Sequence, residues 1–167
     1  MFVQFKFVHF KNEENLMNPK KICIATSSGG HLKEVLQLKP FYSKYEHYFV
    51  TMPRPDGKDL SKTEKVFFVK CPSRNPIFFA VNFVQSLKIF LKETPDVVVS
   101  CGADAALATC WIAKFFGKKI IYIESFCRPS KPSLTGKLVY PVADLFIYQW
   151  KELDKYYPKG KYGESIF

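Results

Sequence analysis

The chain lacks several of the patterns that would place it in a familiar class. It has no run of about 18 apolar residues, which a conventional transmembrane helix needs. Its five cysteines include no C-x-x-C pair, so a zinc ribbon or a thioredoxin-like centre has no support. Neither the G-x-G-x-x-G fingerprint nor a Walker A loop occurs, which weakens an NAD or ATP assignment. We expect no metal ion and no cofactor.

The N-terminal segment also lacks the apolar centre of a signal peptide. Its Phe and Val residues alternate with polar ones, and Lys6, Lys11 and Glu13 interrupt the stretch. We therefore expect residues 1–20 to be an extension, to which the sequence assigns no function. The odd number and irregular spacing of the cysteines suit a reducing cytosol.

The charge is strongly biased to one sign. The chain has 25 Lys and Arg against 15 Asp and Glu, a net charge of +10. Such a balance favours polyanionic partners, which include phosphate-bearing substrates, nucleic acid and an anionic bilayer. The alternative is a basic surface that only keeps the protein in solution. Aromatic residues make up 17% of the chain, more than one small core needs, so some rings are expected to face a membrane or a partner.

From residue 21 onward, short apolar runs alternate with helical stretches. We expect strands at residues 22–25, 48–51, 66–69, 96–100, 119–123 and 145–148. We expect helices at residues 31–39, 76–92, 103–116, 134–142 and 150–156, with Pro40 ending the first and a polar loop around Pro53, Pro55 and Gly57. The alternation predicts a single α/β domain over residues 21–167, with a Rossmann-like parallel sheet and helices on both faces.

In such sheets ligands bind at the carboxyl ends of the strands. The first candidate is the turn after the first strand, where Ser28, Gly29, Gly30 and His31 open a helix. Glycines let the backbone aim its N–H groups at an anion, and the helix N-terminus favours negative charge. His31 could accept a proton from a hydroxyl group or bind a phosphate. The alternative is a strand-to-helix turn with a serine cap and a partly exposed histidine.

Two more candidates follow later strands. Gly102 permits close approach at a helix start, and Asp104 lies in the first turn, where the helix dipole alone could explain a carboxylate. Glu124 comes directly after an apolar strand, at the edge of the sheet, and could hydrogen-bond a sugar hydroxyl or act as a base. Arg128 suits a diphosphate, although an ion pair between Arg128 and Glu124 is the structural alternative.

The helix at residues 77–92 is unusually apolar. Helical spacing predicts a core face made of Phe79, Phe83, Val84, Leu87, Phe90 and Leu91, and a polar face made of Asn82, Gln85, Lys88 and Lys92. Phe78, Val81 and Ile89 interrupt the polar face. Apolar residues beside Lys88 and Lys92 suit shallow contact with a bilayer. Burial of this helix under a partner domain explains the pattern equally well.

Three segments together resemble the asparagine-linked glycosylation protein fourteen family and its bacterial relatives in capsule and exopolysaccharide synthesis. The segments are SSGGHLKEVLQL (27–38), DVVVSCGADAALA (96–108) and IIYIESFCRPSKPSLTGKLVYPVADLFIYQW (120–150). The motifs that carry the resemblance are G-G-H near the start, a P-D-hydrophobic strand leading to a glycine loop, E-S-x-C-R, S-x-[ST]-G-K and a closing Q-W.

This resemblance implies a fold equivalent to the N-terminal half of a GT-B glycosyltransferase. It implies a subunit that contributes the acceptor site and recruits a separate donor-binding subunit to the cytoplasmic face of the membrane. The implied reaction transfers a sugar from a UDP-sugar to a polyprenyl diphosphate-linked saccharide. The implied partners are the donor-binding subunit, the lipid-linked acceptor, the shared UDP-sugar and the membrane surface, with no nucleic acid. Because no N-terminal membrane helix is evident, we expect a prokaryotic source and peripheral attachment.

Under this hypothesis His31 and Glu124 are the catalytic candidates. The substrate and diphosphate candidates are Ser28, Gly29, Gly30, Gly102, Asp104 and Arg128. The membrane-contact candidates are Phe78, Val81, Lys88, Ile89 and Lys92. Two alternatives stay open: a free-standing Rossmann-like nucleotide-binding module, and a non-catalytic anchor or enhancer of a partner that does all the chemistry.

Overall fold

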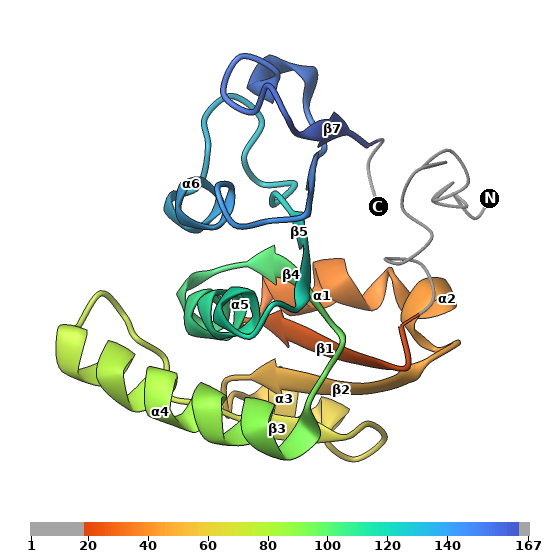
Figure 1. Cartoon of the computed structure of the whole chain (residues 1–167), viewed down its shortest axis with the longest axis vertical. Helices are drawn as coiled ribbons and strands as arrows, with labels where there is room; N and C mark the ends of the chain where they lie inside the picture. The colour runs from red at the N-terminus through yellow and green to blue at the C-terminus, as the bar shows by residue number, and fades with distance from the viewer. Residues whose placement is uncertain (1–18, 164–167) are drawn as a thin grey trace.

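The computed structural model describes residues 19–163 of the 167-residue chain (Figure 1). The extension expected at residues 1–20 lies almost wholly outside the described residues.

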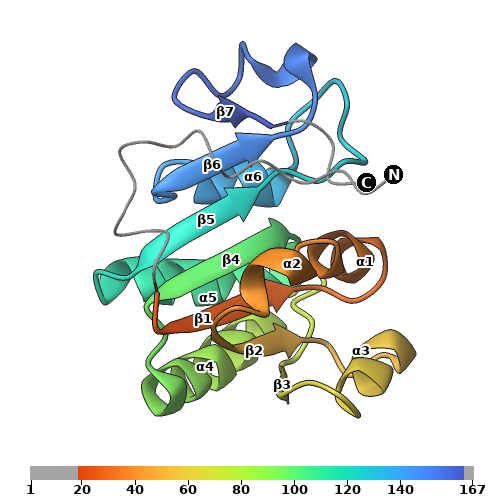
Figure 2. The same ribbon diagram turned by 90° about the vertical axis from the view of Figure 1, so that its right-hand side faces the viewer.

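Within this part of the chain, seven strands form one parallel sheet in the order β3-β2-β1-β4-β5-β6-β7. The strands are β1 (Lys21–Thr26), β2 (Glu46–Thr51), β3 (Val66–Phe68), β4 (Val97–Gly102), β5 (Lys119–Ile123), β6 (Leu145–Tyr148) and β7 (Lys161–Tyr162). The chain winds outward from β1 to β3 and then crosses back to place β4 on the other side of β1 (Figure 2). This is the Rossmann order, so the expected fold class is confirmed.

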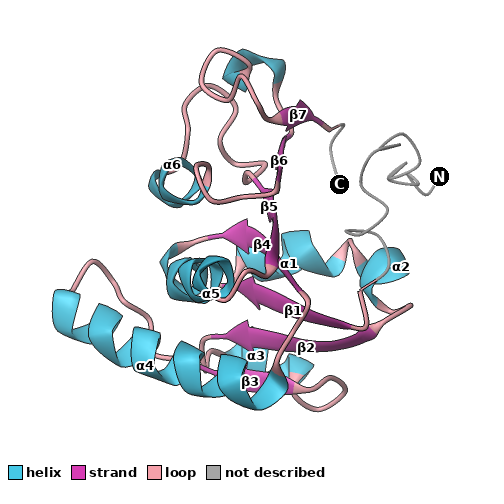
Figure 3. Ribbon diagram, viewed as in Figure 1, coloured by secondary structure: helices cyan, strands magenta, loops and turns pink. Residues whose placement is uncertain are grey.

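The helices lie on both faces of the sheet (Figures 1 and 3). They are α1 (Gly30–Leu36), α2 (Lys39–Tyr42), α3 (Pro55–Leu60), α4 (Pro76–Glu93), α5 (Asp104–Phe115) and α6 (Leu134–Val139), with a 3-10 turn η3 (Lys151–Leu153). One face carries α4, α5 and α6, and the other carries α1 and α2.

Alternate residues of the central strands fill the two cores. Cys23 and Val98 pack on the α4–α5 side, whereas Ile24 and Val99 pack on the α1 side. Because successive side chains of a strand point to opposite faces, a strand buried on both faces must be apolar throughout. This explains why the apolar runs located β1, β4 and β5 from sequence.

Two prolines begin helices that the sequence prediction did not include. Pro55 is the first residue of α3, where a polar loop was expected, and Asp56 follows in its first turn. Pro40, expected to end a helix, lies in the first turn of α2 after α1 has already ended at Leu36. Proline is well tolerated in the first turn because the N–H it lacks has no partner within the helix.

The predicted core face of α4 is correct for Phe90 and Leu87 and wrong for its other four residues, which are exposed. Its buried residues are Asn82, Ser86, Phe90 and Glu93, so three polar side chains face the protein. The Asn82 amide donates to the Lys70 carbonyl at 2.8 Å. Since these polar groups have partners inside, they can be buried at little cost.

Glu93 shows how a charge is held on this buried face. Its carboxylate accepts hydrogen bonds from Lys65 at 2.6 Å and from Lys21 at 3.0 Å, while only 4% of the Glu93 side chain is exposed. Burial opposes ionisation of Glu93, but the two ammonium groups outweigh it and lower the pKa of the carboxyl group. The pair of lysines thus fixes the C-terminal end of α4 against β1 and β3.

The outer side of α4 is correspondingly apolar. Its stripe consists of Ile77, Val81, Val84 and Leu91, which are 69%, 42%, 50% and 55% exposed. Phe78, Lys88 and Lys92, three of the membrane-contact candidates, are also exposed. Ile89, another candidate, is half-buried and packs against the core. No helix within residues 19–163 is long and apolar enough to span a bilayer.

Candidate functional site

The candidate site lies at the carboxyl ends of the neighbouring strands β1 and β4. The helix that follows β1, α1, packs on one face of the sheet, and the helix that follows β4, α5, packs on the other. The turn after β1 ends at Gly29, α1 begins with Gly30 and His31, and β4 ends at Gly102. The Ser27 N–H donates to the Gly102 carbonyl at 3.3 Å. Ligands of such sheets bind at this switch in strand order. The fold therefore brings together two glycine-containing segments that are far apart in sequence.

His31 stands between these two segments. Its Nδ1 lies 3.0 Å from the Cys101 carbonyl oxygen. Because a carbonyl can only accept, Nδ1 must carry the proton, and the neutral ring then has its lone pair on Nε2. The side chain is 30% exposed. A histidine held in this tautomer can take a proton from a hydroxyl group at Nε2.

Gly102 is required for this close approach. Its φ of +100° lies in the region that favours glycine, and a Cβ there would come within 2.9 Å of the Tyr122 hydroxyl and 3.6 Å of His31 Cε1. Gly29 also has a positive φ, +88°, but a Cβ there would meet nothing within 4 Å. Both Gly29 and Gly30 are exposed.

Two of the groups expected to bind diphosphate already have hydrogen-bond partners within the protein. The buried Ser28 hydroxyl donates to the Met52 carbonyl at 3.1 Å, which ties the turn to the end of β2. The Gly29 N–H donates to the Asp56 carboxylate of α3 at 2.5 Å. In this arrangement neither group is directed at a ligand.

The remaining diphosphate candidates lie apart. Asp104 accepts a hydrogen bond from the Ser73 N–H at 2.9 Å, so it fixes the segment that precedes α4. Arg128 is exposed, and none of the ion pairs found among the described residues includes it. The ion pair between Arg128 and Glu124, considered from sequence, is therefore absent.

Glu124 was expected to hydrogen-bond a sugar hydroxyl or to act as a base, but its side chain is fully buried. Its carboxylate accepts hydrogen bonds from the Ser125 N–H at 3.0 Å, the Ser133 N–H at 3.2 Å and the Tyr157 hydroxyl at 2.5 Å. Burial raises the pKa of Tyr157, and the nearby carboxylate raises it further, so this hydroxyl stays protonated as a donor. Gly136 leaves room for this cluster, since a Cβ there would collide with Glu124 Oε2.

Glu34 is the site residue that the sequence analysis missed. It is 2% exposed and accepts hydrogen bonds from the Phe126 N–H at 2.7 Å, the Gln149 amide at 2.7 Å and the Ser125 hydroxyl at 3.3 Å. Its Oε2 also lies 3.8 Å from His31 Nδ1. Burial raises the pKa of Glu34 despite these hydrogen bonds. The signal was its position three residues after His31, which places both on one side of α1.

The closing Q-W motif has a structural explanation. Gln149 joins Glu34 to the Glu124 carbonyl, which its amide reaches at 3.0 Å, and the Trp150 indole N–H donates to the Phe126 carbonyl at 2.7 Å. The segment after β5 is thus held by Glu34 of α1, by Gln149 and Trp150 directly after β6, and by Glu124, the first residue of the segment. Buried carboxylates that accept several hydrogen bonds make such a segment rigid.

This architecture is that of a Rossmann-like domain equivalent to one half of a GT-B glycosyltransferase. MurG from Acinetobacter baumannii has a similar fold, with a TM-score of 0.68 and 13% identity over 80% of this chain and 43% of that one. A UDP-N-acetylglucosamine 2-epimerase from Rickettsia bellii gives a TM-score of 0.69 and 14% identity over 85% of this chain and 42% of that one. The chain therefore spans less than half the length of these structures.

The chain belongs to the family described as oligosaccharide biosynthesis protein Alg14 like, whose pattern matches residues 65–166. It is 54% identical to the UDP-N-acetylglucosamine transferase subunit ALG14 of Saccharomyces cerevisiae, over 91% of this chain and 79% of that protein. It is 27% identical to the Homo sapiens protein of the same name, over 84% of this chain and 80% of that protein. The resemblance found in the motifs is confirmed, whereas the expectation of a prokaryotic source finds no support in these relatives.

The burial of Glu124 predicts a structural cost for its substitution. We expect Glu124→Gln to lower the free energy of unfolding by about 1–3 kcal/mol. The glutamine NH2 group would replace a carboxylate oxygen that accepts hydrogen bonds, so at least one of the N–H and O–H donors around it would lose its acceptor. Thermal or urea unfolding of the purified chain measures the change. Glu152→Gln is the matched control, since Glu152 is exposed. Equal stability of Glu124→Gln and the wild type would contradict the role of this carboxylate in fixing the segment.

Proposed function

We propose that this chain is the acceptor-side subunit of a two-chain glycosyltransferase. The complex transfers a sugar from a UDP-sugar to a polyprenyl diphosphate-linked saccharide, and the donor is held mainly by the other chain. Membership of the Alg14 family supports the proposal, because its curated members are named as subunits of a UDP-N-acetylglucosamine transferase.

The observation that carries the proposal is one of size and architecture. This chain spans about four fifths of relatives named as subunits, but only 43% of MurG, whose fold it shares. Relatives of this length hold little more than the domain seen here. A glycosyl transfer must hold two substrates in one geometry, which a site between two domains provides. In this family the second domain would come from another chain.

Complementation by a partner tests the proposal. We expect the purified chain to transfer no sugar alone, and to support transfer when it is mixed with a donor-binding glycosyltransferase chain and a lipid-linked acceptor. Radiolabelled UDP-sugar with extraction of the lipid product measures the transfer, and the partner alone is the control. Robust turnover by either single chain would contradict a shared site.

His31 is the chain's own candidate for proton transfer. The acceptor hydroxyl must lose its proton as it attacks, and the Cys101 carbonyl keeps the His31 lone pair on Nε2. Glu34, 3.8 Å from Nδ1, adds a carboxylate that stabilises the ring once it is protonated. Glu124, a second catalytic candidate from sequence, is proposed instead to act through the segment it fixes, because it is buried.

We therefore expect His31→Ala to lower the turnover of the assembled pair by about a hundredfold or more, with folding and partner binding unchanged. Lys33→Ala, an exposed change on the same helix, is the control. Thermal unfolding and co-purification with the partner accompany the rate measurement. A wild-type rate in His31→Ala would favour the alternative of a non-catalytic enhancer, which the internal partners of Ser28, Gly29 and Glu124 also support.

We also propose that the exposed side of α4 attaches the chain to the cytoplasmic face of a membrane. An apolar stripe of Ile77, Val81, Val84 and Leu91 lies on the same helix as Lys88 and Lys92. Apolar side chains and cations combined on one exposed helix surface suit the interface of an anionic bilayer. At the end of α5 the apolar surface continues with Phe115 and Phe116, and Phe116 stacks on Phe90 of α4 at 5.2 Å.

Vesicle sedimentation tests this attachment. We expect the wild-type chain to bind vesicles containing phosphatidylserine, and salt to weaken the binding because its electrostatic part is screened. The double variant Val81→Asp, Val84→Asp should lose most of the binding, since both side chains are exposed on the outer side of α4, and thermal unfolding checks that the variant is folded. Leu134→Asp, 65% exposed at the start of α6, is the control. Equal sedimentation of both variants would remove α4 as the anchor.

A further inference from the structure

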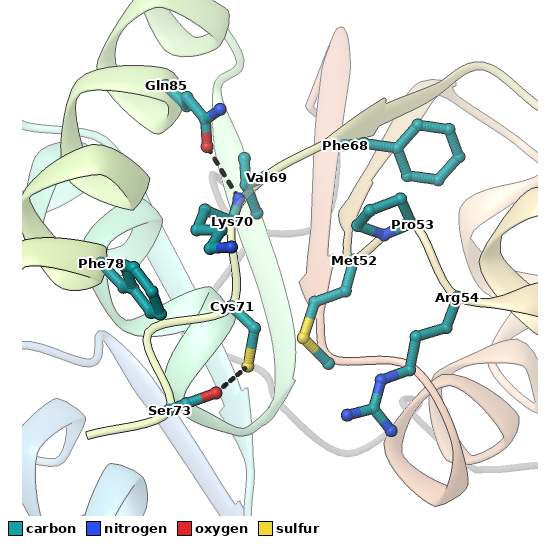
Figure 4. A pocket seen from close by; sticks show the side chains of 10 residues that line it. All are labelled: Met52, Pro53, Arg54, Phe68, Val69, Lys70, Cys71, Ser73, Phe78 and Gln85. Atoms are coloured by element: carbon teal, nitrogen blue, oxygen red, sulfur yellow. Dashed lines mark hydrogen bonds between the residues drawn. The ribbon is translucent and has the colours of Figure 1, made fainter. Parts of the chain in front are cut away.

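A cavity of about 450 Å³ opens beside the candidate site, and nothing in the sequence motifs points to it. It lies between the segment that joins β2 to α3, the end of β3 with the segment that follows it, and α4 (Figure 4). Its lining consists of Met52, Pro53, Arg54, Phe68, Val69, Lys70, Cys71, Ser73, Phe78 and Gln85. Met52 accepts the hydrogen bond from Ser28, so the cavity adjoins the turn that leads to His31.

The charged groups of this cavity are both cations. None of the ion pairs formed by residues 19–163 includes Arg54 or Lys70. The Lys70 ammonium group lies 4.4 Å from the centre of the Phe78 ring, a contact that leaves its charge uncompensated. Asp56 accepts a hydrogen bond from the Gly29 N–H and Asp104 accepts one from the Ser73 N–H, and neither carboxylate forms an ion pair with Arg54 or Lys70. An anion would therefore be attracted to this opening.

The rest of the lining is largely apolar. Phe68 and Phe78 are 37% and 38% exposed, so both present apolar surface beside Arg54 and Lys70. Phe78 belongs to α4, whose exposed apolar stripe begins one residue earlier at Ile77. A ligand with an anionic head and a hydrocarbon tail would use both kinds of surface.

One wall of the cavity also carries backbone strain. Ser73 and its neighbour Arg74 have φ values of 47° and 60°, although neither is glycine. Two hydrogen bonds hold them, from the Ser73 N–H to Asp104 at 2.9 Å and from the Asn75 N–H to the Pro72 carbonyl at 2.8 Å. Strained backbone of this kind persists where the surroundings fix it, and it is frequent at ligand sites.

From these observations we infer that the cavity binds the diphosphate and the first isoprenoid units of the acceptor lipid. Arg54 and Lys70 contact the diphosphate, and Phe68 and Phe78 contact the hydrocarbon. The tail then leaves along α4 toward the bilayer, while the sugar points toward the turn that holds His31. This inference rests on the proposed function, because it names where that reaction's acceptor is held.

Direct binding to the full chain, without its partner, tests the inference. The probe is farnesyl diphosphate, measured by isothermal titration calorimetry, with inorganic pyrophosphate, farnesol and UDP as separate arms. We expect farnesyl diphosphate to bind more tightly than the other three. Arg54→Gln and Lys70→Gln should each weaken its binding about tenfold, the scale expected for a lost charge-assisted hydrogen bond. Phe68→Ala should weaken farnesyl diphosphate and leave pyrophosphate unchanged.

Matched controls come from exposed residues outside the cavity. Lys58→Gln on α3 and Tyr156→Ala, a residue that is 39% exposed and lies outside the cavity, should bind the probe like the wild type. No binding of farnesyl diphosphate, or wild-type affinity in both cation variants, would overturn the inference. Equal binding of UDP that is lost in the same variants would make this a nucleotide site and overturn it as well.

The assembled pair separates this inference from the proposed function. Arg54→Gln should raise KM for the lipid-linked acceptor about tenfold and leave KM for the UDP-sugar unchanged. An active pair whose acceptor KM does not respond to Arg54→Gln would overturn only the cavity assignment. An inactive pair, together with tight farnesyl diphosphate binding that depends on Arg54 and Lys70, would overturn the proposed reaction and leave the cavity as a polyprenyl diphosphate site.

Discussion

Two buried carboxylates organise the carboxyl edge of this sheet. Glu34 and Glu124 come from different elements, yet both accept hydrogen bonds from the segment that follows β5. An unpaired carboxylate in this position would be strongly destabilising, so the backbone N–H groups must be placed around it. The E-S-x-C-R and Q-W motifs supply these donors. The Gln149 amide, for example, donates to the Glu34 carboxylate and to the Glu124 backbone carbonyl. His31 lies next to this cluster, because its Nδ1 is 3.8 Å from Glu34 Oε2.

The long helix α4 follows a different rule. It is apolar on nearly every side, yet Asn82, Ser86 and Glu93 are the residues that it turns inward with Phe90. Each inward polar group meets a partner, such as the Lys70 carbonyl for Asn82 and the Lys21 and Lys65 ammonium groups for Glu93. The apolar side chains on the outer side of α4 remain exposed to solvent in the folded chain. Exposed apolar side chains grouped on one helix favour a contact with something outside the chain, which agrees with the attachment proposed above.

Sequence reasoning located the sheet well and the side chains around its edge less well. The strands β1, β4 and β5 were found because strands buried on both faces leave continuous apolar runs. The sequence placed both glycine turns at the carboxyl ends of strands, but that β1 and β4 are neighbours is known only from the structure. The orientation of α4 could not be predicted, because periodicity measures polarity and not whether Asn82 has an internal acceptor. Glu34 lies three residues after His31 in a segment that carries the family resemblance, but only the structure shows its hydrogen bonds to the segment after β5. Arg54 lies outside the motifs, so its role is argued from its neighbours in space.

The distribution of charge along the edge unites these features. On the side of β5 and β6, carboxylates are buried and satisfied by the protein, so that side is rigid. On the side of β2 and β3, Arg54 and Lys70 have no carboxylate partner among the described residues, so that side attracts anions. His31 lies between the two sides. Its ring is next to Glu34, and Ser28, three residues earlier in the chain, donates a hydrogen bond to the Met52 carbonyl. A phosphate drawn to the cationic side would leave an attached sugar near the imidazole, and the rigid side would keep that imidazole in position. A net charge of +10 describes the whole chain, whereas the orientation of a substrate depends on where individual charges such as those of Arg54 and Lys70 lie.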